Sequence, residues 1–306
     1  MEAQCYQESK FLLSANRGHA MHHAFTVDVE EWFHGIPINE QVGRAAKYRL
    51  HVGLDVLLQL MTEYQVRGTF FVLGPVARDS PQLIQRIANS GHELGCHGWS
   101  HELLYRITPQ RMYEETLRAT EIIADVTGKR VTSYRAPLFS ITKQSLWSLE
   151  VLAKLGYLYD SSIFPVRNWR YGIADFERRP HLIQTLEGPI FEFPLSTRRV
   201  LGCNMPVSGG AYFRIYPYWL TSANFRTFER ENRPVIFYLH PWELDIDQPR
   251  VRFYWKARLT HYFNLGSTVG KLRRLLGDFK FVPLGEMLDD HIAVSKSKLQ
   301  ASTKWS

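Results

Sequence analysis

Short apolar runs alternate with longer amphipathic stretches along most of this chain. The runs are rich in β-branched and aromatic residues, which favours strands. Seven are predicted strands: 24–30, 68–74, 92–98, 131–137, 156–162, 190–196 and 235–241. The stretches between them repeat apolar residues at the spacing of one helix face. They predict four helices, over 48–66, 80–91, 108–128 and 142–156.

Alternating strands and helices build βα units around a parallel sheet. Seven strands predict a closed or nearly closed β/α barrel. An open, doubly wound sheet is the alternative, but no GxGxxG or GxxxxGK[ST] loop follows any of the strands. The weaker pattern over 200–232 is typical of an insertion before the last strand. No internal repeat or linker interrupts the chain, so we expect one domain with a C-terminal elaboration.

Composition narrows the class of protein. The 306 residues are 45% apolar and 22% charged, which provides ample material for a core. Three cysteines, widely spaced and without a CxxC pair, predict neither a disulfide framework nor a thiolate metal cluster. No apolar run approaches the ~18 residues of a membrane helix, and the N-terminal stretch predicts no secretory signal because its apolar core is only 11–13.

The net charge of +7 comes mainly from one segment. Between Asp247 and Lys280 there are eight Lys or Arg residues and only two Asp, and the densest part is 271–276. Such a patch can attract an anionic polymer, nucleic acid or membrane headgroups, whereas a solvated helix face is the plainer interpretation. No nucleic-acid motif accompanies it, so we expect no nucleic-acid partner.

Polar residues gather where the predicted strands end. In a parallel β/α barrel the chemistry lies at the carboxyl ends of the strands. Apolar strands that end on charged groups are costly unless those groups converge and satisfy one another. A chance HxxxH pair is common among twelve histidines, so His97 and His101 alone indicate little. The prediction depends on the whole set of polar residues at the strand ends: Asp28, Glu30, Glu31, His97, His101, Arg135, Asp160, His240 and Glu243.

This set fits metal-assisted hydrolysis. Two imidazoles and one carboxylate on a divalent ion leave positions for water and substrate. Asp28 and Glu30 share one strand face, so one can bind the metal while the other takes a proton from water. Arg135 can pair with the free carboxylate. His240 can protonate the leaving group, with Asp160 or Glu243 holding its tautomer.

The motifs resemble a known family. "TVDVE", "HGWSH", "RAP", "DSS" and "LHP" resemble, in order, the five motifs of polysaccharide deacetylases, the NodB homology domain of carbohydrate esterase family 4. The resemblance covers about 24–243. It implies a distorted (β/α)7-type barrel and a hydrolase of carbon–nitrogen bonds other than peptide bonds. It also implies one divalent metal ion, usually Zn2+, with Co2+, Ni2+ or Mn2+ as alternatives.

Longer stretches resemble one subfamily, the deacetylases of bacterial exopolysaccharide loci of the exosortase/PEP-CTERM type. These are "DVEEWFH", "GGAYFRIYPYWL", "FYLHPWELD" and "RFYWKARLTHYFNLGSTVGKLRRLL". This resemblance implies four parts: a flexible leader (1–22), the barrel (23–245), a C-terminal extension packed on it (246–290) and a tail (291–306).

The family's roles carry over to individual residues. The resemblance implies that Asp28 is the catalytic base, that Arg135 orients it and that His240 is the catalytic acid. His97 and His101 match the metal histidines, and Asp160 falls in the motif whose acid tunes the catalytic histidine. Many members have two adjacent aspartates in the first motif, whereas Val29 separates Asp28 from Glu30 here. By resemblance to branches with this spacing we assign Glu30 to the metal, and Glu31 is the alternative.

The substrate contacts are expected around the same cleft. Four aromatic residues are candidates for stacking on sugars, with core packing as the alternative for each: Trp32, Tyr212, Tyr238 and Trp242. The turn Pro137, Leu138 and Phe139 is assigned to the substrate, with Leu138 and Phe139 as a pocket for the acetyl methyl. A backbone N–H near Phe139 is expected to stabilise the oxyanion.

The expected function is therefore deacetylation of N-acetylated, or O-acetylated, sugars in a bacterial exopolysaccharide or its lipid-linked precursor. A hydrolase of small cyclic or linear amides and a non-catalytic glycan-binding relative are the alternatives. A serine hydrolase is disfavoured because no GxSxG elbow occurs. The expected location is the cytoplasm or the cytoplasmic membrane face, with the periplasm as alternative. Arg250–Lys280 is the expected contact with an anionic membrane or polymer, and the oligomeric state is open.

Overall fold

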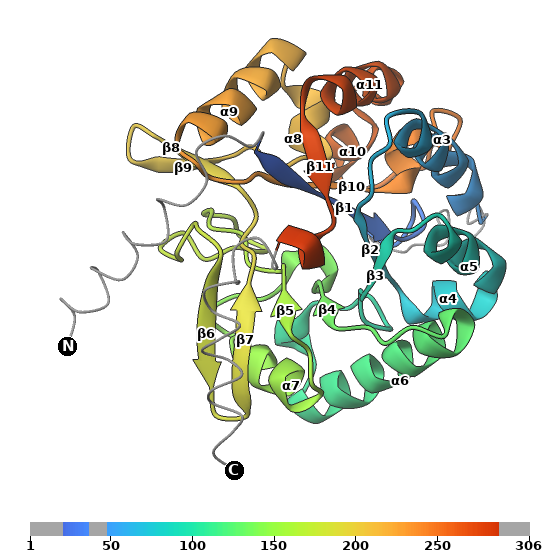
Figure 1. The fold of residues 1–306 in the computed structure, drawn as a ribbon, viewed down its shortest axis with the longest axis vertical. Coiled ribbons are helices and arrows are strands. Elements are labelled where there is room, and N and C mark those ends of the chain that lie inside the picture. The colour runs from blue at the N-terminus through green and yellow to red at the C-terminus, as the bar shows by residue number, and fades with distance from the viewer. Residues whose placement is uncertain (1–20, 37–47, 288–306) are drawn as a thin grey trace.

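A curled, mostly parallel sheet forms the centre of the molecule (Figure 1). The structure is a computed structural model and describes residues 21–36 and 48–287, so the predicted tail and nearly all of the predicted leader lie outside the described residues. The strand order is β10-β1-β2-β3-β4-β5-β7-β6, and only β6 runs antiparallel, to β7. β6 and β10 do not pair, so the sheet is an incomplete barrel in this part of the chain.

All seven predicted strands lie in this sheet. They are β1 (His22–Val29), β2 (Thr69–Val72), β3 (Glu93–Cys96), β4 (Ser133–Tyr134), β5 (Tyr159–Asp160), β7 (Gly188–Glu192) and β10 (Ile236–Leu239). The strands that the pattern did not indicate are β6 (His181–Thr185), β8 (Thr197–Val200), β9 (Cys203–Pro206) and β11 (Lys280–Val282). The predicted α/β class is confirmed, and β8 and β9 form a separate hairpin.

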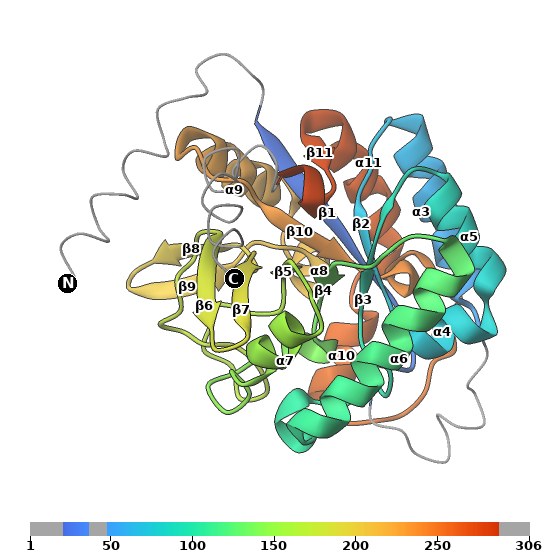
Figure 2. The same ribbon diagram turned by 60° about the horizontal axis from the view of Figure 1, so that its bottom comes forward.

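The helices surround the outer face of the sheet (Figure 2). They are α3 (Leu50–Glu63), α4 (Gly74–Asp79), α5 (Pro81–Asn89), α6 (Pro109–Thr127), α7 (Ser148–Lys154), α8 (Gly210–Ile215), α9 (Tyr218–Arg230), α10 (Trp255–Tyr262) and α11 (Thr268–Asp278). Short 3-10 turns are η1 (Leu104–Arg106), η2 (Pro137–Phe139), η3 (Pro241–Leu244) and η4 (Leu265–Ser267). Within the described ranges, every helix is too short or too polar to cross a lipid bilayer.

Local sequence explains where several helices begin and end. The Thr108 side chain accepts a hydrogen bond from the Arg111 N–H and caps α6, and Gly128 ends this helix at φ 68°. The predicted helix over 142–156 is shorter in the structure. Its first residues form a turn because the Ser145 hydroxyl accepts the Thr142 N–H, and α7 begins only at Ser148.

The region 200–232 is not an insertion. It contains β9 and then α8 and α9, which lead into β10 like the other crossovers of the fold. Phe225 and Phe228 of α9 are buried in the outer core. The pattern was weak because α8 is short and begins at a glycine.

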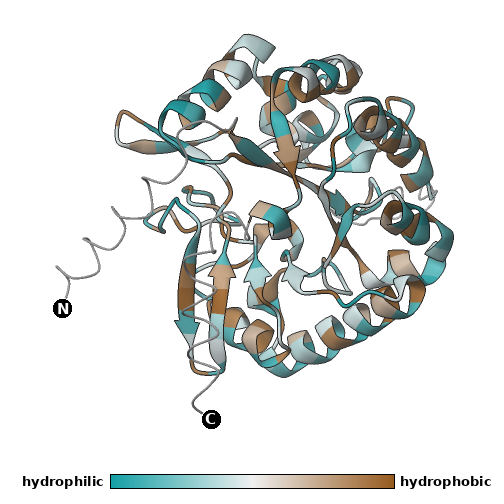
Figure 3. Ribbon diagram, viewed as in Figure 1, coloured by the Kyte–Doolittle hydropathy of each residue, from teal (hydrophilic) through white to brown (hydrophobic). Residues whose placement is uncertain are grey.

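The segment predicted as a C-terminal extension contributes to the sheet itself. β11 pairs in parallel with the first residues of β1. Leu284 and Met287 then pack inside the barrel with Phe71 and Phe193. A second, larger core lies between the sheet and the helices, so apolar residues pack on both faces of the strands. Figure 3 shows hydrophobic residues in the strands and in the helices around them. The boundary at 245–246 stays a prediction.

Candidate active site

A cluster of three ligand-type side chains lies at the carboxyl ends of β1 and β3. Glu30 directly follows β1, and His97 directly follows β3. The loop after β3 returns His101 to the same point through left-handed backbone at Gly98 (φ 79°) and His101 (φ 56°). Glu30 Oε2 lies 2.5 Å from His101 Nε2 and 3.7 Å from His97 Nε2. The three ligand atoms all lie within 4.8 Å of one another.

The donor set of this cluster fits a divalent cation. Glu30 Oε2 and His101 Nε2 are buried and face each other at 2.5 Å without the geometry of a hydrogen bond, and the buried His101 Nδ1 has no hydrogen-bond partner. Leaving a buried polar atom unsatisfied costs roughly 1–3 kcal/mol, and a bound cation would remove that cost. His97 Nδ1 lies 2.8 Å from the Arg135 carbonyl oxygen, which can only accept, so Nδ1 carries the proton. This tautomer leaves the Nε2 lone pair for a metal.

The charges around Glu30 keep its carboxyl group ionised, which is the form that binds a metal. Burial alone would raise the pKa of this carboxyl, but the neighbouring rings of His101 and His97 outweigh it and hold the pKa well below the usual value. Trp242 Nε1–H donates to Glu30 Oε1 at 3.3 Å and leaves Oε2 directed at the histidines. Glu31 is engaged elsewhere, because its carboxylate accepts the Arg49 and Leu50 N–H groups at the start of α3.

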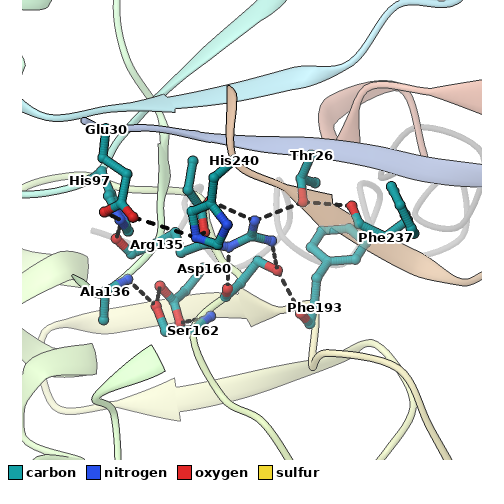
Figure 4. Close-up of polar contacts among 12 residues, drawn as sticks. Thr26, Glu30, His97, Arg135, Ala136, Asp160, Ser162, Phe193, Phe237 and His240 are labelled. Atoms are coloured by element: carbon teal, nitrogen blue, oxygen red, sulfur yellow. Dashed lines mark hydrogen bonds and ion pairs between the residues drawn. The ribbon is translucent and has the colours of Figure 1, made fainter. Parts of the chain in front are cut away.

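A buried arginine, Arg135 (labelled in Figure 4), holds Asp28 beside the cluster. Arg135 Nη1 donates to Asp28 Oδ1 at 2.9 Å and to the Thr26 hydroxyl at 2.7 Å. The same guanidinium donates from Nε to the Ser161 carbonyl and from Nη2 to the Ser161 hydroxyl. Both Arg135 and Asp28 are buried, so this ion pair fixes the orientation of the carboxylate and leaves its Oδ2 available.

His240 approaches from the end of β10. Its Nε2 lies 3.8 Å from Asp28 Oδ2 and 3.6 Å from Glu30 Oε1, and its Nδ1 lies 2.8 Å from Glu243 Oε1. Burial disfavours the imidazolium, but the Glu243 hydrogen bond and the three carboxylates outweigh burial and raise the pKa of His240 to about 9. A cation on Glu30 would offset part of this rise by cancelling the charge of Glu30.

Glu243 is in turn held by Arg214 of α8. Arg214 Nε donates to Glu243 Oε2 at 2.6 Å, and the remaining guanidinium nitrogens donate to the carbonyls of Thr260, His261 and Phe263. Burial would raise the pKa of Glu243, but Arg214 and His240 lower it to about 2. Arg214 was not predicted as a site residue, because no local sequence pattern indicates its role.

Comparisons with known proteins divide the chain into two parts. Residues 52–159 match the family model described as polysaccharide deacetylase, and residues 161–289 match a model described as a domain of unknown function (DUF3473). Over residues 52–159 the chain is therefore similar to polysaccharide deacetylases. His97, His101 and Arg135 lie within the deacetylase match, Asp28 and Glu30 precede it, and the His240–Glu243–Arg214 group lies in the second match.

Several curated relatives are named as peptidoglycan deacetylases. A peptidoglycan deacetylase from Helicobacter pylori is 34% identical over 112 residues, which are 37% of each chain. A peptidoglycan-N-acetylglucosamine deacetylase from Listeria monocytogenes is 28% identical over 44% of this chain and 28% of its own. A peptidoglycan-N-acetylmuramic acid deacetylase from Bacillus subtilis is 32% identical over 33% and 38%. The chain thus spans about a third of the length of these relatives.

Solved structures share the fold over most of the chain. A candidate polysaccharide deacetylase from Mycobacterium smegmatis superposes with a TM-score of 0.60 at 19% identity and covers 92% of this chain and 95% of its own. The Puue allantoinase superposes with a TM-score of 0.56 at 14% identity over 88% and 89%. At these identities the likeness shows the fold alone. The distorted barrel expected for a deacetylase domain is therefore confirmed.

Asp160 does not have the place in the deacetylase domain that its motif implied. Its carboxylate accepts hydrogen bonds from the Ser162 hydroxyl (2.6 Å) and the Ser162 N–H (3.1 Å). The Nδ1 of His240 is occupied by Glu243 instead. The reason is local: His240 directly precedes η3, and the third residue of this turn, Glu243, folds back onto it. The expectation that Asp160 tunes His240 is corrected, and Glu243 takes that position.

Two of the four predicted sugar-stacking residues are packed in the protein. Trp32 is only 1% exposed and lies in a small core with Tyr262 and Leu265. Trp242 is 8% exposed, with His240 stacked against it at 5.0 Å and His261 at 4.3 Å between ring centroids. Their assignment to the substrate is corrected, because neither indole offers a free face.

The other predicted substrate residues line the wall between η2 and β10. Phe139 and Tyr238 pack edge to face with their ring centroids 4.8 Å apart, and the Tyr238 and His240 ring centroids are 5.8 Å apart. The half-buried Tyr212 shares a 3.2 Å hydroxyl contact with Tyr171, which sequence analysis missed. These placements leave their roles as predictions.

The turn after Arg135 has an unusual backbone. Pro137 is buried, Leu138 is partly exposed, and Leu138 and Phe139 both have positive φ, 56° and 52°. Strained backbone of this kind clusters at functional sites. The Phe139 N–H donates to the Ala136 carbonyl at 3.1 Å, so it is already used and the expected oxyanion donor is not this group.

Proposed function

We propose that this protein is a metal-dependent hydrolase that removes acetyl groups from the amino sugars of a polysaccharide. One observation carries the proposal: a metal-type ligand cluster, an arginine-held carboxylate and a carboxylate-held imidazole meet at one point. His240 Nε2 lies within 3.8 Å of both Asp28 and Glu30. The match of residues 52–159 to polysaccharide deacetylases supports the same chemistry.

Each residue has a distinct task in this proposal. The donor set of two imidazoles and one carboxylate favours Zn2+ as the bound cation. This ion would supply Lewis acidity and a water of lowered pKa. Asp28 takes a proton on Oδ2, because Oδ1 is engaged by Arg135. His240, charged at neutral pH, gives a proton to the sugar nitrogen as the carbon–nitrogen bond breaks. Without that proton the amine is a very poor leaving group.

The substrate we propose is an N-acetylated hexosamine in a bacterial exopolysaccharide or in its lipid-linked precursor. The resemblance of the C-terminal stretches to the exopolysaccharide-locus subfamily supports this glycan. The curated relatives are named for peptidoglycan, which makes peptidoglycan the first competing substrate. Among the predicted aromatic residues, the half-buried Tyr212 faces the sugar in this proposal, because Phe139 and Tyr238 are only 7% and 6% exposed and pack against each other.

The test is hydrolysis of three substrates by the zinc-loaded protein, measured as acetate release from N-acetylglucosamine oligomers and peptidoglycan and as ring opening of a hydantoin, a cyclic amide. We expect one free amine per acetate from an acetylated glycan, and a loss of about 10²–10⁴-fold in Asp28→Asn. Hydantoin opening without acetate release would indicate a cyclic-amide hydrolase. Oligomer binding without turnover of any substrate would indicate a non-catalytic glycan-binding protein.

We also propose that the basic segment Arg250–Lys280 contacts an anionic membrane at its cytoplasmic face. Support comes from exposed side chains in this segment: Arg252 and Arg258 lie close in sequence to the exposed Tyr254 and Trp255, and Arg273 and Arg274 are exposed on α11. Basic residues near an anionic surface contribute about 1 kcal/mol each. The periplasm is the alternative location, and an anionic polymer is the alternative partner.

Cosedimentation with vesicles tests this contact. Arg258→Gln/Arg274→Gln should weaken binding to anionic vesicles about 30-fold, whereas Lys129→Gln/Arg199→Gln, on other exposed surfaces, should not. Equal sedimentation of the wild type with anionic and neutral vesicles would contradict the membrane proposal. Binding to a soluble acidic polymer alone would favour the polymer.

A further inference from the structure

Two buried carboxyl groups lie next to each other beneath the candidate site. Asp160 ends β5 and Glu192 ends β7, and the two residues are direct partners in the parallel register. Both side chains are 0% exposed. Neighbouring carboxylates in a low-dielectric interior do not both stay ionised, because their repulsion is unscreened.

The hydrogen bonds of the pair leave one oxygen without a donor. Both oxygens of Asp160 accept from Ser162, one from its hydroxyl and one from its N–H. Glu192 Oε1 accepts the Ile163 N–H at 3.0 Å. Glu192 Oε2 is buried and accepts from no donor. An oxygen that carries a proton has no need of a donor, and it can itself donate to the neighbouring Asp160.

The charges around the pair favour the same protonation state. Burial, and then the charge of Asp160, raise the pKa of Glu192 well above its usual value. Burial also raises the pKa of Asp160, but the hydrogen bonds from Glu192 and Ser162, and then the charge of Arg135, act in the opposite direction and favour its ionised form. The remaining titratable residue in register with Glu192 is His181 of β6, whose ring packs against Phe176 and whose Nδ1 contacts the Arg179 carbonyl.

The pair is connected to the candidate site through the Arg135 turn (Figure 4). The Ser162 hydroxyl, which donates to Asp160, also accepts the Ala136 N–H at 2.7 Å. The preceding residue, Arg135, binds Asp28 with its side chain and His97 with its carbonyl. Asp28 already forms an ion pair with Arg135, so a second negative charge on the Asp160–Glu192 pair would compete with Asp28 for the same guanidinium.

We propose that Glu192 is held as a neutral carboxylic acid that donates to Asp160, and that this singly charged pair positions the Arg135 turn. Both are positioning residues, because neither contacts the ligand cluster or His240 in the described part of the chain. Asp160 thus serves the base and metal side of the site through Ser162, rather than the catalytic acid.

The unfolding of Glu192→Gln tests the protonation state. An acid with a raised pKa in the folded state loses stability as pH rises above its unfolded pKa, and glutamine removes this loss while keeping a donor. The Tm of Glu192→Gln relative to wild type should therefore increase with pH between 5 and 9, by roughly 3 °C per pH unit until the folded pKa is passed.

Two controls accompany this series. Glu187→Gln, on the exposed turn between β6 and β7, should show no such trend. Asp160→Asn should be destabilised at every pH, because an amide has only one acceptor oxygen and cannot accept from Ser162 at both positions. A Tm difference for Glu192→Gln that stays constant from pH 5 to 9 would overturn the proposal. So would a pH-dependent gain in Asp160→Asn instead, which would place the proton on Asp160.

Acetate release tests the positioning role and rests on the proposed function, whereas the unfolding series does not. Glu192→Gln should keep kcat within about threefold, and Glu192→Leu, which has no donor, should lose about tenfold with its metal still bound. Rescue by glutamine but not by leucine is the expected result. Equal loss of kcat in both variants would contradict a role for the donated hydrogen bond.

Discussion

The candidate site has a metal side, formed by Glu30, His97 and His101, and an acid side, formed by His240, Glu243 and Arg214. The two sides differ in how completely their buried polar atoms are hydrogen-bonded within the protein. On the metal side, Glu30 and His101 keep buried atoms without any hydrogen-bond partner. On the acid side, both oxygens of Glu243 are engaged, one by His240 and one by Arg214. The metal side therefore needs a cation to become complete, whereas the acid side is complete in the protein alone.

This difference has a physical consequence for each side. A cluster with unsatisfied buried atoms gains stability when a ligand supplies the missing contacts, so metal binding and local order are coupled. A satisfied network keeps its geometry without a ligand, so His240 is held before substrate arrives. Gly53 of α3 makes room for this network, since a Cβ there would lie 1.8 Å from the Pro241 carbonyl oxygen beside His240.

His240→Ala should produce the largest effect and should affect only the acid side. We expect acetate release to fall by about 10²–10⁴-fold, because general acid catalysis is lost. Zinc affinity, measured by competition with a chelator, should stay within a few fold of wild type. His22→Ala, an exposed histidine at the start of β1, is the control. Loss of zinc in His240→Ala would show that the two sides are not separable.

Arg214→Met should destabilise the fold through the acid side. It leaves Glu243 buried without its cation, and breaking a buried ion pair costs about 3–5 kcal/mol. The free energy of unfolding in urea measures this loss. Arg214→Met/Glu243→Gln should recover part of it, and Arg230→Met on the exposed face of α9 should cost little. A loss below about 1 kcal/mol would contradict the view that this network is fixed by Arg214.

His101→Ala should affect the metal side alone. Removing one of three ligands should weaken zinc binding by at least about 100-fold, since losing an outer-shell partner already costs up to that much. Glu102→Gln, at the exposed neighbouring residue, should keep the wild-type affinity. Unchanged affinity in His101→Ala would mean that the cluster is not the metal site.

Substitution of His261, behind the acid side, should have a smaller effect on the free energy of unfolding, and this effect should depend on pH. Burial, with Arg214, lowers the pKa of His261 to about 3, while the unfolded chain takes up that proton near 6.5. Stability should therefore fall as pH drops from 6.5 toward 3. In His261→Gln the slope of unfolding free energy against pH should be shallower by up to about 1.4 kcal/mol per pH unit. His22→Gln should leave the slope unchanged, and equal slopes in His261→Gln and wild type would contradict this account.

The metal side was predictable because its signals are local. Asp28 and Glu30 follow from the two-residue period of a strand, and His97 and His101 from a four-residue spacing directly after another strand. The seven sheet strands were predictable for a similar reason, since each is a short apolar run between turn residues. β11 was not, because three residues after a helix give too little pattern.

The acid side was only half predictable because its second half is tertiary. His240 and Glu243 lie on one turn, but Arg214 reaches them from α8, 29 residues before Glu243 in sequence. The pairing of Asp160 with Glu192 depends likewise on strand order. The prediction of sugar-stacking aromatic residues failed for another reason, because the sequence does not show that both faces of the Trp242 indole are covered.

The most direct test is a titration of the metal-free protein with zinc, in which bound metal and acetate release from an acetylated hexosamine oligomer are measured in the same samples. The account predicts that release rises in proportion to bound zinc and saturates at one ion per chain. Full acetate release by the chelated, metal-free protein would contradict it. Zinc bound at one ion per chain without any release would contradict the assignment of this site to deacetylation.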